Sequence, residues 1–351
     1  MPACFHLTSL IDAMRPTVDI AITTYNQAGL VAKTIESAMA QSYGDLAISI
    51  YDDCSSDETE AVCRAYAAED KRITYHRGGQ NLGILGNFEK AIANSRNPYL
   101  TILHGDDILY PDFIRETVEL GLEKHPQATF AYTLHERLVD DRPTGDMFQF
   151  VPALDTGEHD VLKYLCLTNW IITSFAVMRR ESLARIGELA RYRNKGTHGF
   201  IDHYLFSSLA AIGTAYVVNQ RLGGYRIHEA TSTAGLAGSL RYKECAIHSY
   251  DVIYQDVGIF EDKYRYIAKA NQIGRLLTSR GIVATLGEMM GSIEIHDLMA
   301  TFSLDLSITL IEALERMVFD AHEEPACNFR LESPSNIFAL SEYVRKANNK
   351  A

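Results

Sequence analysis

The sequence predicts an α/β fold in which helices cover both faces of a parallel sheet. Two observations lead to this prediction. Over residues 18–124, apolar stretches with strand character alternate with segments of helical periodicity, and such alternation is typical of units that build parallel sheets. In addition, 47% of the 351 residues are hydrophobic, so the chain can bury a core sufficient for one large domain or two ordinary ones.

Four strand–helix pairs are expected in the first part of the chain. Short apolar runs indicate the strands, and apolar residues three or four positions apart indicate the helices. Ser56 or Asp57 is expected to cap the second helix. The expected strands are residues 18–23, 46–51, 73–76 and 99–103, and the expected helices are residues 30–41, 56–68, 87–95 and 112–124.

The later part of the chain changes character after Thr233. Before that point strands and helices are mixed, whereas afterwards helical periodicity dominates. Strands are expected at residues 128–139, 173–178 and 216–218, and a helix at residues 202–212. We therefore expect an α/β domain over residues 1–233 and a helical C-terminal domain over residues 234–351.

The composition argues against several classes of protein. The formal net charge of −12 disfavours a nucleic-acid-binding protein, which needs a basic surface. The six cysteines form no Cys-x-x-Cys pair, so neither a zinc site nor a disulfide framework is expected. Residues 1–15 lack the pattern of a signal peptide, and no stretch has the uninterrupted apolar length of a membrane span. We therefore expect a cytoplasmic location.

Polar residues follow three of the expected strands at the point where each strand ends. Because ligands of such sheets bind beyond the carboxyl ends of the strands, we expect these clusters to meet at one edge. Adjacent carboxylates repel each other unless a cation shares them, and Mg²⁺ or Mn²⁺ often bridges carboxylates to substrate phosphates. The clusters are Thr23-Thr24-Tyr25-Asn26, Asp52-Asp53 and Asp106-Asp107.

Each acidic pair also has a structural interpretation. Asp106 and Asp107 would stabilise the start of the helix that follows, and Asp52 and Asp53 would close a turn at a strand end. The convergence of three clusters favours the functional interpretation. No glycine-rich segment has the spacing G-x-G-x-x-G or G-x-x-x-x-G-K-[ST], so neither a dinucleotide fingerprint nor a P-loop is expected.

The order of short motifs resembles that of the family 2 glycosyltransferases. The matching segments are Ile22-Thr23-Thr24-Tyr25-Asn26, Ser37-Ala38-Met39-Ala40-Gln41-Ser42-Tyr43, Tyr51-Asp52-Asp53-Cys54-Ser55-Ser56-Asp57-Glu58-Thr59, Asn81-Leu82-Gly83 and Gly105-Asp106-Asp107 with Pro111. The resemblance covers residues 16–228. It implies the GT-A fold, a Rossmann-like nucleotide-sugar-binding domain with a mixed sheet and an Asp-x-Asp-type metal motif, in which Gly105 here takes the place of the usual first Asp.

The resemblance also implies roles in donor binding. Asp53 would accept a hydrogen bond from the base, with uracil favoured because a carboxylate pairs well with an imide N–H. Asp106 would face the ribose or the metal, and Asp107 would bind Mn²⁺ or Mg²⁺. Tyr225-Arg226-Ile227-His228 resembles the family's Tyr-Arg-x-His stretch. Its basic residue and imidazole, near the metal, would stabilise the charge that grows on the leaving diphosphate, and His228 would be a further metal ligand. The alternative is a structural strand end with an Arg on the surface. The other residues expected to bind the nucleotide-sugar are Thr23, Tyr25, Asn26, Asn81, Gly83, Asn87 and Arg226.

Asp202 matches the catalytic base of this family. It would take a proton from the acceptor hydroxyl as the new bond forms. Members often carry Glu before this Asp, whereas this chain has Ile201. The alternative is a carboxylate that interacts with the dipole of its helix. The only tryptophan, Trp170, precedes Asp202, so the Gln-x-x-Arg-Trp motif of processive synthases cannot follow the base. Trp170 itself would fill the core or stack on a sugar.

The sequence therefore predicts an inverting, metal-dependent glycosyltransferase that moves one sugar from a UDP-sugar to a glycan, a lipid-linked saccharide or a glycosylated metabolite. One alternative is a sugar-nucleotide pyrophosphorylase, although the segment after the first strand lacks the basic residues of that class. Another is a non-catalytic nucleotide-sugar-binding homologue, for which Ile201 is the only indication. The C-terminal helices are expected to complete the acceptor site or to form a homodimer, and peripheral membrane contact is the remaining alternative.

Overall fold

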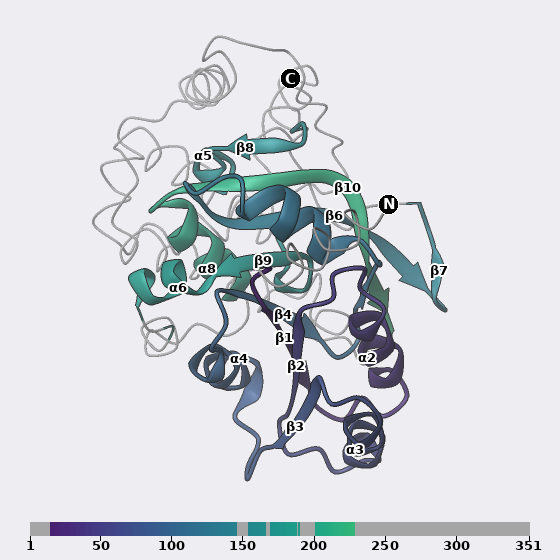
Figure 1. Ribbon diagram of the computed structural model, residues 1–351. Coiled ribbons are helices and arrows are strands. Elements are labelled where there is room, and N and C mark those ends of the chain that lie inside the picture. The colour runs from purple at the N-terminus through teal and green to yellow at the C-terminus, as the bar shows by residue number, and fades with distance from the viewer. Residues whose placement is uncertain (1–14, 146–153, 166–168, 188, 190–200, 229–351) are drawn as a thin grey trace, which may run out of the picture.

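The computed structural model describes residues 15–145, 154–165, 169–187, 189 and 201–228 (Figure 1). The predicted C-terminal domain, residues 234–351, lies outside the described residues, and so does its predicted boundary. Within the described ranges, no helix combines the length and the apolar character that a membrane span requires.

The first half of the sheet is parallel. In spatial order it consists of β3 (Ile73–Arg77), β2 (Leu46–Asp52), β1 (Val18–Thr24) and β4 (Tyr99–His104). Each neighbouring pair runs in the same direction. The parallel arrangement predicted for these four strands is therefore confirmed, and their carboxyl ends lie at one edge.

The second half makes the sheet mixed. Strand β9 (Ala176–Arg179) runs antiparallel to both β4 and β6 (Ala128–Val139). Strand β10 (Thr214–Ile227) then runs parallel to β6, and β5 (Ile108–Leu109) pairs with it in the opposite direction. The short strands β7 (Arg142–Pro143) and β8 (Gly157–His159) pair with β6 and β10.

Helices cover both faces of this sheet (Figure 1). Side chains alternate along a strand, so Ile20 and Ile22 of β1 face one apolar cluster while Ala21 faces the other. The helices that pack in the first cluster are α2 (Val31–Met39), α3 (Thr59–Glu69) and η1 (Arg115–Leu122). Those that pack in the second are α4 (Gly83–Asn94), α5 (Leu162–Leu165), α6 (Arg180–Ile186) and α8 (Ile201–Ala210).

Two segments differ from the sequence prediction in the type of secondary structure. The helix expected at residues 112–124 is a π-helix, in which the Glu123 amide reaches the carbonyl of Val118, five residues back. The strand expected at residues 173–178 begins as a 3₁₀ turn, η2 (Thr173–Phe175), before β9. This turn brings Thr173 and Ser174 to the carboxyl end of β4, where their side chains bond to His104 and Asp107.

The long strand β10 was predicted only in part. It bends as it passes β6, with register shifts between Val218 and Gly224. A larger residue at the bend would displace its neighbours, because a Cβ on Gly223 would lie 2.2 Å from the Phe175 ring and one on Gly224 would lie 2.3 Å from the Leu138 side chain. The bend carries Arg226 and His228 back towards the end of β4.

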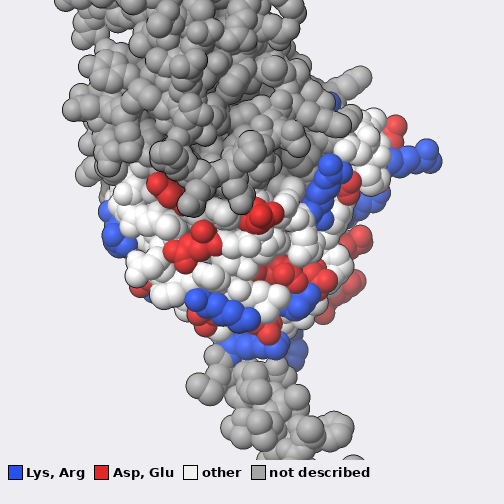
Figure 2. All heavy atoms as spheres, turned by 90° about the horizontal axis from the view of Figure 1, so that it is seen from above, with Lys and Arg blue, Asp and Glu red and all other residues white. Residues whose placement is uncertain are grey.

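Figure 2 shows one face of the molecule, on whose described part acidic and basic side chains are interspersed.

Candidate functional site

The three predicted polar clusters lie at the same edge of the sheet. Thr24 of β1 pairs with Asp52 of β2, and Thr23 pairs with His104 of β4. Beyond the strands, the Asp53 amide donates to the carbonyl of Thr24 at 2.9 Å and the Gly105 amide to that of Thr23 at 2.8 Å. The segments that follow β2 and β4 are thus joined to the end of β1 by backbone hydrogen bonds.

Asp52 and Asp53 have different hydrogen-bond partners and different structural roles. Asp52 is fully buried and accepts hydrogen bonds from Ser55 and from the hydroxyl of Tyr75, at 2.6 Å in each case. This is the turn-closing role considered for it. Asp53 accepts the amides of Leu82 and Gly83, both at 2.8 Å. Each carboxylate oxygen can accept more than one hydrogen bond, so Asp53 can hold the loop before α4 and still accept a base N–H.

The asparagines among the predicted donor-binding residues hold the loops together. The side-chain oxygen of Asn26 accepts the amide of Ser56 at 2.8 Å, which ties the loop after β1 to the loop after β2. Asn87 is buried and donates to the carbonyl of Tyr51 at 2.9 Å. Asn81 accepts the amide of Gly83, which has a φ of +73°. These contacts shape the wall of the site.

The two residues expected to line the nucleotide pocket lie at the end of β1. Thr23 is half-buried. Tyr25 leaves 46% of its surface exposed, which suits an aromatic ring that stacks on a planar ligand. Both positions are compatible with the roles expected from the sequence.

The acidic turn after β4 gathers three potential cation ligands. One ligand atom from each of His104, Asp106 and Asp107 lies within 4.8 Å of the other two. Asp107 is 1% exposed, and its Oδ2 accepts the Ser174 hydroxyl at 2.6 Å. The Nε2 atom of His228 lies 3.1 Å from an oxygen of Asp106.

Gly105 could not carry a side chain in this turn. A Cβ there would lie 2.8 Å from Cβ and Oγ1 of Thr24 and 2.4 Å from the side chain of Gln27. The third potential cation ligand beside Asp106 and Asp107 is instead His104, a residue for which no role was predicted from the sequence. Its position directly before the Gly-Asp-Asp run was the available signal.

Burial sets the electrostatics of the turn. Burial raises the pKa of Asp107 to about 7, and the neighbouring Asp106 carboxylate adds to this rise. Burial also acts to raise the pKa of Asp106, but the hydrogen bond with His228 and the charge of His104 outweigh it and lower that pKa. Two carboxylates in this arrangement leave a local negative charge that a cation would neutralise.

Asp202 lies beside this turn. It is in the first turn of α8, and its Oδ1 accepts the amide of Thr173 at 3.2 Å. The hydroxyl of Thr173 lies 2.9 Å from Nε2 of His104, and Nδ1 of that ring lies 3.6 Å from Asp107. Burial raises the pKa of Asp202. A contiguous set of polar contacts therefore joins the predicted base to the predicted metal carboxylate.

The environment of Ile201 explains one departure from the family pattern. Its side chain is buried in the apolar cluster beneath α8. A second acid at this position would point into the core rather than towards Asp107. Trp170 is also buried, at 2% exposure, and packs against Tyr132 and Tyr164, so it fills the core.

Thr173 and Ser174 are site residues that sequence reasoning missed. They were expected to form a strand, and neither residue type marks a site by itself. Only the antiparallel placement of β9 between β4 and β6 brings the preceding turn to Asp107. Long-range register of this kind has no local sequence signal.

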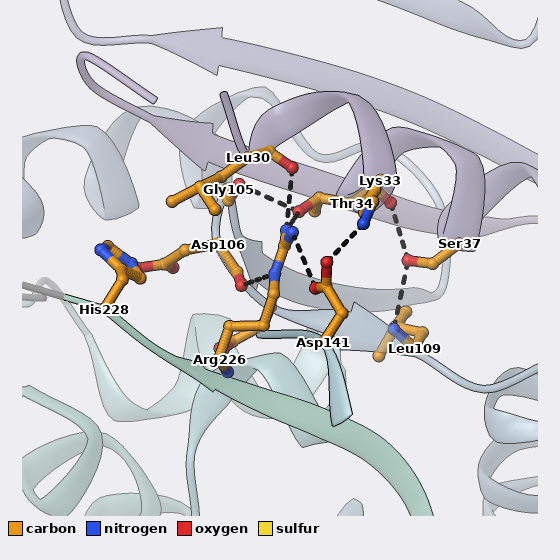
Figure 3. A network of polar contacts seen from close by, with 11 residues as sticks. Leu30, Lys33, Thr34, Ser37, Gly105, Asp106, Leu109, Asp141, Arg226 and His228 are labelled. Carbon is orange, nitrogen blue, oxygen red and sulfur yellow. Dashed lines mark hydrogen bonds and ion pairs between the residues drawn. The ribbon is translucent and has the colours of Figure 1, made fainter. Parts of the chain in front are cut away.

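Arg226 lies differently from the expected donor ligand. Its side chain is 4% exposed and points beneath the acidic turn towards α2 (Figure 3). The guanidinium donates to the carbonyls of Leu30 and Asp106 and to the hydroxyl of Thr34. These bonds occupy a large part of its hydrogen-bonding capacity.

The residues of the turn fit a hard divalent cation. Carboxylate oxygens are the preferred ligands of Mg²⁺ and Mn²⁺, and an imidazole also suits Mn²⁺. Asp106, Asp107 and His104 present such a set, with His228 adjacent. The raised pKa of Asp107 indicates a carboxylate whose ionised form needs positive charge nearby.

Comparisons with known proteins find similarity to glycosyltransferases. A family model described as glycosyl transferase family 2 matches residues 19–187. A putative teichuronic acid biosynthesis glycosyltransferase, TuaG of Bacillus subtilis, is 28% identical over 61% of this chain and 80% of its own length. An uncharacterized protein of Sinorhizobium fredii, y4gI, is 33% identical, but the match covers 36% of this chain and only 14% of that protein.

Solved structures share the fold at low sequence identity. TarS 1–349 of S. aureus, in complex with UDP-GlcNAc, has a TM-score of 0.55 at 14% identity and covers 86% of this chain and 82% of its own. The mannosyltransferase PcManGT of Pyrobaculum calidifontis, in complex with GDP-Man and Mn²⁺, has a TM-score of 0.57 at 15% identity, with 89% of both chains covered. The mixed sheet with its flanking helices is thus the GT-A fold.

Proposed function

Because residues 19–187 are a family 2 glycosyltransferase domain, we propose that this chain is an inverting, metal-dependent enzyme that transfers a single sugar. The donor is a UDP-sugar, and the acceptor is a hydroxyl of a glycan, a lipid-linked saccharide or a glycosylated metabolite. The observation that carries the proposal is the chain of contacts from Asp202 through Thr173 and His104 to Asp107.

Asp202 acts as the general base in this proposal. Its Oδ1 is held by the Thr173 amide, so Oδ2 takes the proton of the acceptor hydroxyl. As that proton moves, the acceptor oxygen forms its bond to the anomeric carbon. The bond from this carbon to the diphosphate breaks, and its electron pair leaves on the nucleoside diphosphate. Attack from the opposite face inverts the anomeric carbon, so an α-linked donor gives a β-linkage. The raised pKa of Asp202 suits proton abstraction.

The acidic turn holds the donor's diphosphate end. Asp106 and Asp107, with His104 or His228, would hold Mn²⁺ or Mg²⁺. When bound, the cation supplies positive charge that stabilises the leaving diphosphate. Asp53 and Tyr25 lie along the same edge, where the base and ribose would be placed. Asp53 favours uracil because its carboxylate accepts the imide N–H.

The acceptor is proposed from the name of one relative, and the cellular setting from the sequence. TuaG is named for teichuronic acid biosynthesis, which supports a growing glycan as the acceptor. We place the enzyme in the cytoplasm, with peripheral contact to the inner face of the membrane where a lipid-linked acceptor would be met. The proposed C-terminal domain, residues 234–351, would complete the acceptor site or form a homodimer.

Nucleotide release from a panel of sugar nucleotides tests the proposal. The full chain is incubated with UDP-sugars and with GDP-mannose, in Mn²⁺ and again in EDTA. We expect slow hydrolysis of one UDP-sugar that depends on Mn²⁺. Release from GDP-mannose alone would exclude UDP selectivity. Nucleotide binding without hydrolysis or transfer, for any donor and any saccharide acceptor, would indicate the non-catalytic homologue instead.

A further inference from the structure

Arg226 is a buried cation with no role in the mechanism above. Its side chain leaves β10 and passes under the acidic turn to the first turns of α2 (Figure 3). Nη2 donates to the carbonyl of Leu30 and to the hydroxyl of Thr34, each at 2.8 Å. Nε donates to the carbonyl of Asp106. The planar guanidinium thus spans two parts of the chain that are far apart in sequence.

Helix α2 holds the same turn from its other side. The Thr34 hydroxyl, which accepts from Arg226, donates to the carbonyl of Gly105 at 2.9 Å. One turn further along α2, the Ser37 hydroxyl accepts the amide of Leu109 at 3.1 Å. The backbone amide of Arg226 lies 3.4 Å from Oδ1 of Asp107. Backbone groups on both sides of the two carboxylates are therefore fixed by Arg226 and α2.

A carboxylate outside the turn also pairs with Arg226. Asp141 lies 3.7 Å from Nη1, at the tip of the β6–β7 hairpin, and also forms an ion pair with Lys33 of α2 (Figure 3). Asp140 and Asp141 both adopt a positive φ, of +51° and +58°, which is typical of a tight hairpin turn. The hairpin thus delivers one carboxylate to the buried guanidinium.

We infer that Arg226 is a positioning residue that fixes the geometry of the Gly105-Asp106-Asp107 turn, with Thr34 and the Asp141–Lys33 pair supporting it. The inference rests on the proposed function, because it gives the turn's geometry a role in cation binding. Its structural content is independent of that function, since the contacts are made without any ligand.

The contacts distinguish this role from direct donor binding. A donor ligand presents its charged head to the site, whereas this guanidinium donates to two carbonyls and a hydroxyl and is 4% exposed. Groups that orient metal ligands without touching the metal commonly contribute about tenfold or more to metal affinity. The same contribution is expected here.

Three variants and one matched control isolate the effect. Arg226→Met removes the guanidinium but keeps an unbranched side chain. Thr34→Val removes only the hydroxyl, and Asp141→Asn removes only the charge of the supporting carboxylate. Asp140→Asn is the control, because it makes the same change one residue away in the same turn. Asn tolerates a positive φ, so neither Asn variant strains the hairpin.

Hydrogen–deuterium exchange of the full chain without ligand measures how well the backbone amides of the turn are protected. The amides of Gly105, Asp107 and Leu109 are hydrogen-bonded, so the peptide that covers residues 104–109 should be protected. We expect its exchange to accelerate in Arg226→Met and Thr34→Val, less in Asp141→Asn, and not in Asp140→Asn. Peptides from β1 and β2 should exchange as in the wild type. Unchanged exchange at residues 104–109, or equal acceleration throughout the sheet, would overturn the inference.

Mn²⁺ binding, followed by electron paramagnetic resonance in the presence of UDP, gives the functional readout. We expect the dissociation constant for Mn²⁺ to rise about tenfold in Arg226→Met and less in the two conservative variants. A loss of UDP affinity with unchanged Mn²⁺ affinity and unchanged exchange would assign Arg226 to the donor instead. If Arg226→Met does not fold, the exchange and Mn²⁺ affinity of Thr34→Val and Asp141→Asn decide whether the inference holds. If the wild type binds neither Mn²⁺ nor UDP, the proposed function fails while the exchange comparison still decides the inference.

Discussion

At the scale of single residues, the site depends on side chains that hold other side chains. Thr173 contacts Asp202 through its amide and His104 through its hydroxyl. Ser174 donates to Asp107. None of these contacts would be recognised as catalytic from residue type alone, yet they determine how far the proposed base lies from the proposed cation ligands.

Replacing Thr173 by Val should lower kcat with little effect on the donor KM. The change removes the hydroxyl that interacts with both His104 and the proposed base Asp202, but keeps the backbone amide that Asp202 accepts. One hydrogen bond of roughly 1.4 kcal/mol corresponds to about a tenfold loss of rate. Steady-state kinetics measure both parameters. Thr173→Ser keeps the hydroxyl and should retain most of the wild-type rate, so equal losses in the Val and Ser variants would contradict the role of the hydroxyl.

Affinity for Mn²⁺ should depend on pH through Asp107. Burial raises the pKa of this carboxyl to about 7, and a cation binds only the ionised form. Affinity should therefore be weak below pH 6, increase as the pH rises through 7, and level off above pH 8. Below the pKa, a site that loses one proton should lose about tenfold in affinity per pH unit. Calorimetric titration with Mn²⁺ at several pH values measures the slope, and a constant affinity between pH 5.5 and pH 8 would contradict it.

At the scale of secondary-structure elements, short segments position the chemistry. Strand β4 ends in the acidic turn, the 3₁₀ turn before β9 lies beside it, and β10 bends at Gly223 and Gly224, where it pairs with β5 directly after the turn. Helix α2 turns two buried hydroxyls, Thr34 and Ser37, towards the same segment. The turn is thus packed on several sides, which keeps its two carboxylates together.

Gly105→Ala should destabilise the protein and weaken cation binding. The added Cβ would lie 2.8 Å from Thr24 of β1, so either β1 or the acidic turn must shift. Overpacking of this kind typically costs about 1–3 kcal/mol. Denaturant unfolding and Mn²⁺ titration measure the two effects. Gly79→Ala is the control, since no atom lies within 4 Å of a Cβ there. Equal stability of both variants would show that the close packing at Gly105 is not needed.

At the scale of the whole molecule, the sequence predicted the parts that depend on local pattern. Periodicity predicts the four parallel strands and most of their helices. The placement of Asp53 and Asp107 at one edge is predicted because the carboxyl ends of parallel strands lie together and ligands bind beyond them. The antiparallel insertion of β9, the bend of β10 and the 3₁₀ turn could not be predicted in this way. They depend on which strands become neighbours, and that is decided by long-range packing.

The dependence on long-range packing also explains why the contacts of Arg226 and His104 were not predicted. The resemblance placed Arg226 among the donor-binding residues, and no local pattern predicted that the bend of β10 brings its guanidinium to the carbonyls of Leu30 and Asp106. His104 lacked an assignment because Gly105 was taken as the motif's first position. A side chain at Gly105 would require Thr24 or the acidic turn to shift.

The central claim is that one sugar donor lies between the cation ligands and the base, and a paired comparison of Asp202→Asn with Asp107→Ala tests it most directly. For each variant, UDP binding in Mn²⁺ is measured by calorimetry, and turnover is measured with the donor selected by the wild type. We expect Asp107→Ala to lose metal-dependent UDP binding. We expect Asp202→Asn to bind UDP like the wild type and to lose at least about a hundredfold in turnover. Wild-type turnover by Asp202→Asn, or Mn²⁺-dependent UDP binding that survives in Asp107→Ala, would contradict the account.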